Sequence, residues 1–340
     1  SFRKFSTLDI SYNEVRLSNS SLSLSLSLSL SIDHSLPQID AVSPHIFATV
    51  SSVKELNLAH NRITSLGRGT FENIGKALKI LNLGWNEMHT VPEALTDLRV
   101  LQVLKLDGNK LSSIPSDLLQ SLSSLKILDL SKNRIESVTA NWRVRRIGRF
   151  DLSHNRLKIF SCSIFTSLPR VDELDLSHNS LSSLELSCLK SSLHHLTLSH
   201  NQLQTVEEDL LEGAHSLSTL SLSHNQLLSI HANSFSSVPS LSSIDLSHNH
   251  LRLIRKGTFS RQRSISFLDL SHNNIREMES SQLDSLPHLR SLNLSSNSLS
   301  ILHDRLFTNL SSLEILDLSS NPLHSFTDIH LSELQGVIKT

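Results

Sequence analysis

The chain has 340 residues with 31 Lys and Arg against 32 Asp and Glu, so its formal net charge is −1. This balance gives no electrostatic reason to expect a nucleic acid or an anionic membrane as a partner. No window approaches the roughly 20 apolar residues that a membrane-spanning helix needs, so any membrane attachment would use an anchor outside this chain.

The first strand is predicted just before Asn13, in the stretch LDISYN at residues 8–13. A Ser-Leu alternation, SLSLSLSLSLS, follows at residues 21–31, and a step of 24 residues from Asn13 lands on Pro37. His34 then stands where a buried Leu belongs. We interpret residues 18–40 as a degenerate turn containing a tolerated low-complexity tract, the alternative being an extra strand or an adhesive edge. We expect this segment to be the least ordered internal part of the chain.

From residue 56 onward the motif LxLxxN recurs in steps of 22 to 25 residues. Its last residue is Asn61, Asn86, Asn109, Asn133, Asn155, Asn179, Asn201, Asn225, Asn249, Asn273, Asn297 and Asn321. The alternation of LxL predicts one short strand per copy, with both leucines turned inward and the middle residue turned outward. The Asn amide can satisfy backbone groups where the chain leaves each strand, so the repeated Asn predicts a structural ladder from turn to turn.

Between the motifs, apolar residues keep fixed offsets from each Asn, and a Phe often stands ten residues after it. These are Phe47, Phe71, Phe165, Phe235, Phe259 and Phe307. One turn cannot bury its apolar set alone, so neighbouring turns should stack around one elongated core. The prediction is an α/β solenoid that is mostly β with irregular or 3-10 returns. It has about fourteen turns, a parallel concave sheet and a single array over residues 1–340.

The unit LxxLxxLDLSHNxLxxLxxxxFxxL resembles the 24-residue "typical" leucine-rich repeat of animal extracellular proteins. That group includes chaoptin-like adhesion proteins, Toll-type receptor ectodomains and Slit-like secreted proteins, so the resemblance implies a horseshoe that binds proteins outside the cell. Residues 91–101 and 114–125 lean towards cytosolic repeats. The cysteine-rich caps that usually flank extracellular arrays are missing, and the chain begins with Ser, so we expect an internal fragment of a longer protein.

A histidine precedes the ladder Asn in seven copies of the motif. These are His60, His154, His178, His200, His224, His248 and His272. A straight column offers at most two ligands to one zinc ion, and the DLSHN motif lacks the geometry of a catalytic triad. We therefore predict no metal, no cofactor and no enzyme activity. The histidines are interpreted as polar, strand-compatible residues at a solvated edge, with a smaller effect of pH as the alternative.

Trp85 replaces the histidine in one turn, and Gly84 beside it is expected to leave room for the ring. The candidate ligand-binding residues are Trp85, Lys105, Asp107, Lys132, His60 and Arg62. A basic stripe follows the ladder one residue later, at Arg62, Lys110, Arg134 and Arg156. The alternative is a chance Trp at a sheet edge. A second basic cluster, WRVRRIGR at 142–149, is interpreted as solvated surface rather than a sulfated-glycan site.

Cys162 and Cys188 follow consecutive ladder residues at similar offsets, which leaves a disulfide and two free thiols as equal alternatives. Glycosylation sequons stand at Asn19, Asn293 and Asn309 and give weak support for secretion.

The predicted function is a non-enzymatic recognition scaffold that binds protein at the cell surface or outside the cell, as a receptor ectodomain or an adhesion protein. A cytosolic scaffold that assembles signalling partners is the alternative. A homophilic adhesion rod is a third reading.

Overall fold

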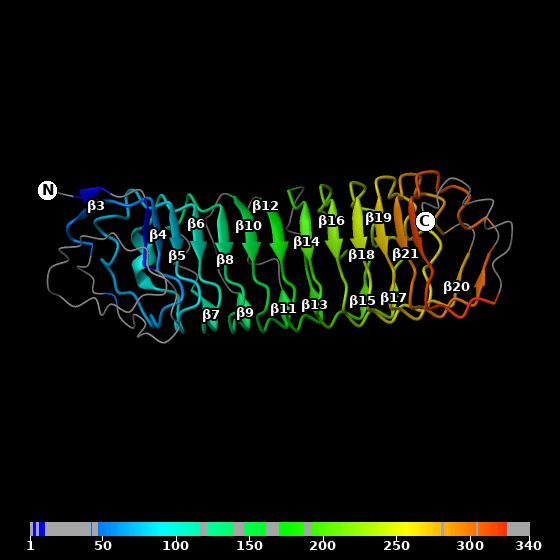
Figure 1. Cartoon of the computed structure of the whole chain (residues 1–340), viewed down its shortest axis with the longest axis horizontal. Helices are drawn as coiled ribbons and strands as arrows, with labels where there is room; N and C mark the ends of the chain where they lie inside the picture. The colour runs from blue at the N-terminus through cyan, green and yellow to red at the C-terminus, as the bar shows by residue number, and fades with distance from the viewer. Residues whose placement is uncertain are drawn as a thin grey trace. The chain divides into compact units, whose positions relative to one another are not determined.

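The computed structural model describes residues 3–4, 7–10, 42, 47–115, 121–138, 146–160, 170–186, 192–279, 282–303 and 305–324. The chain divides into two compact units, whose strands are labelled in Figure 1. The first comprises residues 1–157 and 163–171, and the second comprises residues 158–162 and 172–340. No helix in the described part of the chain is both long and apolar enough to cross a bilayer.

Each unit carries short parallel strands that follow one another in chain order. In the first unit they are β2 (Thr7–Asp9), β4 (Glu55–Asn57), β5 (Ile80–Asn82), β6 (Val103–Lys105), β8 (Ile127–Asp129) and β10 (Ile147–Asp151). In the second they are β12 (Val171–Asp175), β14 (His195–Thr197), β16 (Thr219–Ser221), β18 (Ser243–Asp245), β19 (Phe267–Asp269), β21 (Ser291–Asn293) and β23 (Ile315–Asp317). The prediction of one parallel strand per LxLxxN is confirmed where the structure describes the motif.

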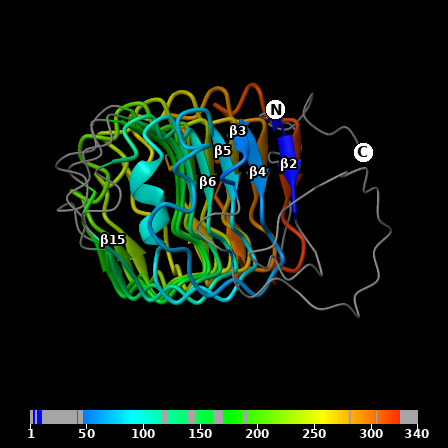
Figure 2. The same ribbon diagram turned by 90° about the vertical axis from the view of Figure 1, so that its left-hand side faces the viewer.

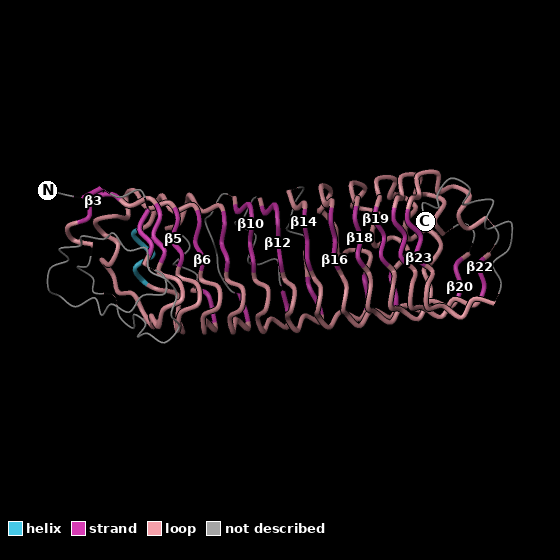
Figure 3. The backbone as a smooth tube through the Cα atoms, viewed as in Figure 1, coloured by secondary structure: helices cyan, strands magenta, loops and turns pink. Residues whose placement is uncertain are grey.

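The returning half of each turn is largely irregular (Figure 3). Two-residue strands pair there between neighbouring turns: β7 (Ser113–Ile114) with β9 (Ser137–Val138), β11 (Ile159–Phe160) with β13 (Ser183–Leu184), β15 (Thr205–Val206) with β17 (Ser229–Ile230), and β20 (Glu277–Met278) with β22 (Ile301–Leu302). Near the start, β1 (Arg3–Lys4) pairs with β3 (Val50–Ser52). The described residues contain one helix, the 3-10 helix η1 (Glu93–Asp97), in the return that joins β5 to β6 (Figure 2).

The predicted number of turns, about fourteen, is too high, and the error lies near the N-terminus. Strand β2 pairs directly with β4, with Leu8 opposite Leu56. A complete turn at Pro37 would have placed its own strand between these two. Proline has no amide side chain for the ladder and no N–H for the sheet, so the repeat pattern is broken in the sequence at Pro37. Residues 18–40 themselves lie outside the described residues, so their predicted disorder stays a prediction.

Register keeps the apolar residues in line from strand to strand. Leu220 pairs with Leu196 on one side and with Ile244 on the other, and all three are at most 1% exposed. Burying one such side chain contributes about 1.5–3 kcal/mol. The predicted Phe spine is present in part, because Phe47 stacks on Phe71 at 6.1 Å and Phe235 on Phe259 at 5.8 Å between ring centroids. Phe165 lies outside the described residues.

Each ladder Asn bonds to two turns at once, as Asn225 illustrates. Its Nδ2 donates to the carbonyl oxygens of Leu222 at 3.0 Å and Ser223 at 3.2 Å in its own turn, and to Leu198 at 2.9 Å in the preceding turn. Its Oδ1 accepts a hydrogen bond from the N–H of Leu203 at 3.1 Å. The amide therefore satisfies the buried backbone groups that become available where each strand ends.

Candidate functional site

The residue before each ladder Asn lies at a left-handed corner of the backbone rather than in the strand. Its φ is 55° at His60, 55° at Trp85, 54° at Lys132 and 52° at His224. Residues with a side chain rarely adopt this region, and His is enriched several-fold among those that do. These histidines, interpreted as strand-compatible residues at a solvated edge, lie just past the strand at this corner, and six of the seven are exposed.

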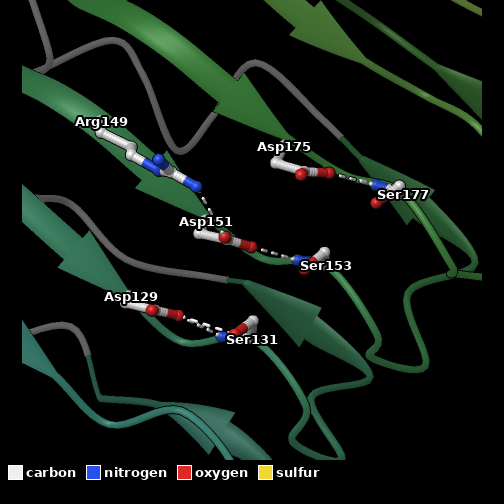
Figure 4. Close-up of polar contacts among 7 residues, drawn as sticks. All are labelled: Asp129, Ser131, Arg149, Asp151, Ser153, Asp175 and Ser177. Carbon is white, nitrogen blue, oxygen red and sulfur yellow. Dashed lines mark hydrogen bonds and ion pairs between the residues drawn. The ribbon is translucent and has the colours of Figure 1, made fainter.

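A second recurring polar contact lies within single turns, where an Asp or Asn stands four residues before the ladder Asn in many copies. Asp129 Oδ1 accepts hydrogen bonds from the N–H of Ser131 at 3.0 Å and from its Oγ at 2.7 Å. Asp151 accepts from the N–H of Ser153 at 2.9 Å, as Figure 4 also shows. The same contact recurs at Asn57, Asn82, Asp175, Asp245, Asp269, Asn293 and Asp317. These side chains form Asx turns that cap the end of the strand.

In the second unit five imidazoles form one continuous stack. The ring centroids of His178 and His200 are 4.0 Å apart, those of His200 and His224 4.1 Å, those of His224 and His248 4.0 Å, and those of His248 and His272 4.1 Å. The pKa of His224 is lowered, first by burial and then by the charges of His248 and His200, with Asp245 opposing them. His224 therefore takes up a proton less readily than a free imidazole.

Trp85 differs from this pattern because its ring is large, half-exposed and held on several sides. It is 45% exposed, and the His60 ring stacks against it with centroids 5.7 Å apart and planes 6° from parallel. Lys132 Nζ lies 5.0 Å from the ring centroid, which is a cation–π distance. The site thus brings His60, Trp85 and Lys132 together from three turns.

Two glycines make this arrangement sterically feasible, and they do so in different ways. A Cβ at Gly108 would lie 2.7 Å from Trp85 Cδ2, so Gly108 leaves the room that the ring occupies. We expected this role for Gly84, but a Cβ there would instead collide with the carboxylate of Asp107. In the sequence, the signal for this arrangement was Gly108, which stands where other turns have His and so leaves space for the Trp85 ring of the preceding turn.

Asp107 lies partly buried beside the ring. Burial raises its pKa above the ordinary carboxyl value, and the charge of Asp129 adds to the effect. A backbone hydrogen bond to the carboxylate and the charge of Lys105 oppose the rise.

The basic stripe one residue after the ladder is interrupted, because Lys110 Nζ lies 3.0 Å from Glu87 Oε2. Arg62, Arg134 and Arg156 are exposed. In the cluster at 142–149, residues 142–145 lie outside the described residues, and Arg149 lies 3.6 Å from Asp151.

Only some of the predicted modification sites lie among the described residues. Cys162, Cys188 and Asn19 lie outside the described residues. Asn309 is exposed, whereas Asn293 is half-buried and its Nδ2 donates to Asp269 Oδ2 at 3.2 Å. A glycan at Asn293 would have to replace that bond, and both sites stay predictions.

The repeat geometry agrees with comparisons to known proteins. A family model described as "Leucine rich repeat" matches seven overlapping stretches: 51–111, 99–157, 145–203, 169–227, 191–251, 215–275 and 263–323. A second model of the same description matches 312–336. The chain belongs to the leucine-rich repeat family.

Several named relatives match parts of this leucine-rich repeat chain. Podocan-like protein 1 of Mus musculus is 30% identical over 170 residues, which cover 48% of this chain and 26% of the relative. Osteomodulin of Rattus norvegicus is 28% identical over 188 residues, covering 51% and 41%. Chaoptin of Drosophila melanogaster is 33% identical over 107 residues, covering 32% and 8%. The chain spans less than half the length of each of these proteins.

Solved leucine-rich repeat structures superpose on most of the chain. The leucine-rich repeat domain of APL1B has a TM-score of 0.69 and 27% identity, covering 84% of this chain and 79% of that one. Toll in the Drosophila Toll–Spatzle complex has a TM-score of 0.74 and 21% identity, covering 88% and 40%. At that identity the Toll comparison shows the shared fold alone.

Proposed function

We propose that this leucine-rich repeat chain is a non-enzymatic recognition scaffold that binds a protein at the cell surface or outside the cell. The contact centres on Trp85. The resemblance to the 24-residue repeat of animal extracellular proteins supports the location. A solved structure of the LRIM1/APL1C complex, 28% identical to this chain with a TM-score of 0.67, supports protein binding through this fold.

The observation that carries the proposal is the half-exposed Trp85 ring, held by His60, Lys132 and Gly108. Trp is enriched among interface residues that dominate binding energy, and a ring already fixed in place loses little entropy on binding. The imidazole stack of the second unit presents the same residue at each corner, so it offers a partner little to distinguish one turn from another.

A scaffold role also agrees with how the DLSHN motif is used. In the DLSHN copy at 245–249 the Ser247 hydroxyl donates to Asp245 at 2.7 Å, and Ser131 does the same to Asp129 in the related DLSKN at 129–133. A nucleophilic Ser would instead donate to a His that acts as its base. The polar residues of the motif are therefore occupied in closing the turn.

The substitution Trp85→Ala should weaken partner binding by about 2 kcal/mol or more, roughly 30-fold, because it removes the aromatic anchor. A binding screen against a panel of secreted and cell-surface ectodomains, which includes a second copy of this chain, would identify the partner. Calorimetric titration then measures its affinity. His224→Ala, at the equivalent corner of the second unit, is the matched control and should change affinity little. Equal and negligible losses in both folded variants would exclude Trp85 as the anchor.

A further inference from the structure

We propose that the partner presents an acidic protein segment to the Trp85 surface, with carboxylates flanking the side chain that covers the indole. This rests on the function proposed above and specifies the chemistry of the partner. Acidic and basic residues are both present on this face of the first unit. The basic side chains are more available to a partner than the acidic ones.

Four carboxylates of the first unit are partly buried or already have partners in the protein. Asp129 and Asp151 accept backbone hydrogen bonds as caps at 3.0 and 2.9 Å, and Asp151 is only 8% exposed. Asp107 is partly buried, and its carboxylate lies against Gly84. Glu87 is in an ion pair with Lys110. Donors already occupy these oxygens, so they contribute less to attracting a basic partner.

The cations, in contrast, project from the surface. Lys132 reaches across the Gly108 turn to the face of Trp85, and Lys105 is exposed on its strand. Arg134 and Arg156 are exposed and form no ion pair within the described residues. A carboxylate close to one such cation is attracted weakly in water and more strongly as the interface loses water.

This arrangement is specific to the first unit. The equivalent positions in the second unit, one residue after the ladder, are Ser180, Gln202, Gln226, His250 and Asn274. None of these is Lys or Arg. An acidic segment that covers Trp85 would therefore meet Lys105 on the next turn and Arg134 and Arg156 two and three turns further along. The same segment over the imidazole stack would meet no Lys or Arg at the equivalent positions.

A random peptide library displayed on phage tests the inference without presupposing a sequence. Selection on the wild-type chain should enrich peptides in Asp and Glu around an aromatic or apolar residue. The best peptide is then titrated against Arg134→Gln/Arg156→Gln. The matched control is Gln202→Glu/Gln226→Glu, which changes the net charge by the same amount on the second unit. We expect a loss of about tenfold or more for the first variant and less than about twofold for the second.

The outcomes separate this inference from the proposed function. Selected peptides that are neutral or basic but lose affinity in Trp85→Ala would overturn the acidic partner and leave the binding site standing. Acidic peptides that bind Trp85→Ala as tightly as the wild type would overturn both. A heparin-derived oligosaccharide that binds through Arg134 and Arg156, with no acidic peptide enriched, would replace the protein segment by a sulfated glycan.

Discussion

Replacing Asn225 with alanine should lower the free energy of unfolding by about 3 kcal/mol or more. The Asn225 side chain is 6% exposed and makes three hydrogen bonds to carbonyl oxygens and one to an N–H. Alanine would leave these buried groups without partners, and each unsatisfied group costs about 1–3 kcal/mol. Because two of the four partners belong to the preceding turn, the substitution should also weaken the stacking between turns.

Urea unfolding of the full chain measures this effect, and hydrogen exchange locates it. Amides of Leu203 and its neighbours should lose protection first. Gln226→Ala, the next residue along and exposed to solvent, is the matched control and should change stability by about 0.5 kcal/mol at most. A loss of under about 1 kcal/mol in Asn225→Ala would contradict the structural role of the ladder.

The second large effect is expected from acid acting on the imidazole stack. Lowering the pH from about 7.5 to about 5 should destabilise the second unit by about 1–2 kcal/mol. Two imidazolium charges about 4 Å apart repel by about 1 kcal/mol in water, and four neighbouring pairs compose the stack. The carboxylates of Asp175, Asp245 and Asp269 on the same turns offset part of the repulsion.

The direction follows from the pKa of His224, which is lowered in the folded chain. The unfolded chain therefore binds protons more readily at this position. The stability that the neutral stack contributes is complete above the unfolded pKa, near 6.5. It falls as the pH drops below that value towards the folded pKa.

The double variant His224→Asn/His248→Asn separates the acid-induced loss of stability due to the stack from that due to histidines outside the stack. Asn tolerates the left-handed corner, so the backbone is retained while the stack is interrupted. Urea unfolding of both proteins at the two pH values should show a smaller acid-induced loss in the variant. Parallel losses in the two proteins would mean that the stack does not govern the response to acid.

Strand positions could be predicted from the sequence because they depend on a pattern that every turn repeats. The alternation of LxL fixes which face of the strand is buried, and the period fixes the register, so Leu196 and Leu220 meet as expected. The number of turns could not be obtained in this way. Counting by period assumed a strand near Pro37, but whether a damaged copy still joins the sheet depends on the pairing of β2 with β4.

The corner conformation and the caps were missed for a different reason. Periodicity carries no information on φ, so His224 looked like a strand residue, although it has a φ of 52°. The two-residue spacing from Asp245 to the N–H of Ser247 is the usual signature of an Asx turn, and it was present in the sequence.

The candidate site depends on contacts between turns, which one sequence reveals only indirectly. Trp85 stood out because it breaks the histidine column. That Gly108 rather than Gly84 makes room for the ring, and that Lys132 reaches it from two turns away, follows from the direction in which the indole lies. A rotamer of this kind is set by packing and not by spacing along the chain.

The most direct test of the central claim is the fluorescence of Trp85 during partner binding. The chain has two tryptophans, so Trp142→Phe leaves Trp85 as the sole emitter. The half-exposed ring should lose contact with water when a partner covers it, and its emission should shift to shorter wavelength in proportion to the fraction bound. Saturable binding that leaves the emission of Trp85 unchanged would contradict the claim that this residue anchors the partner.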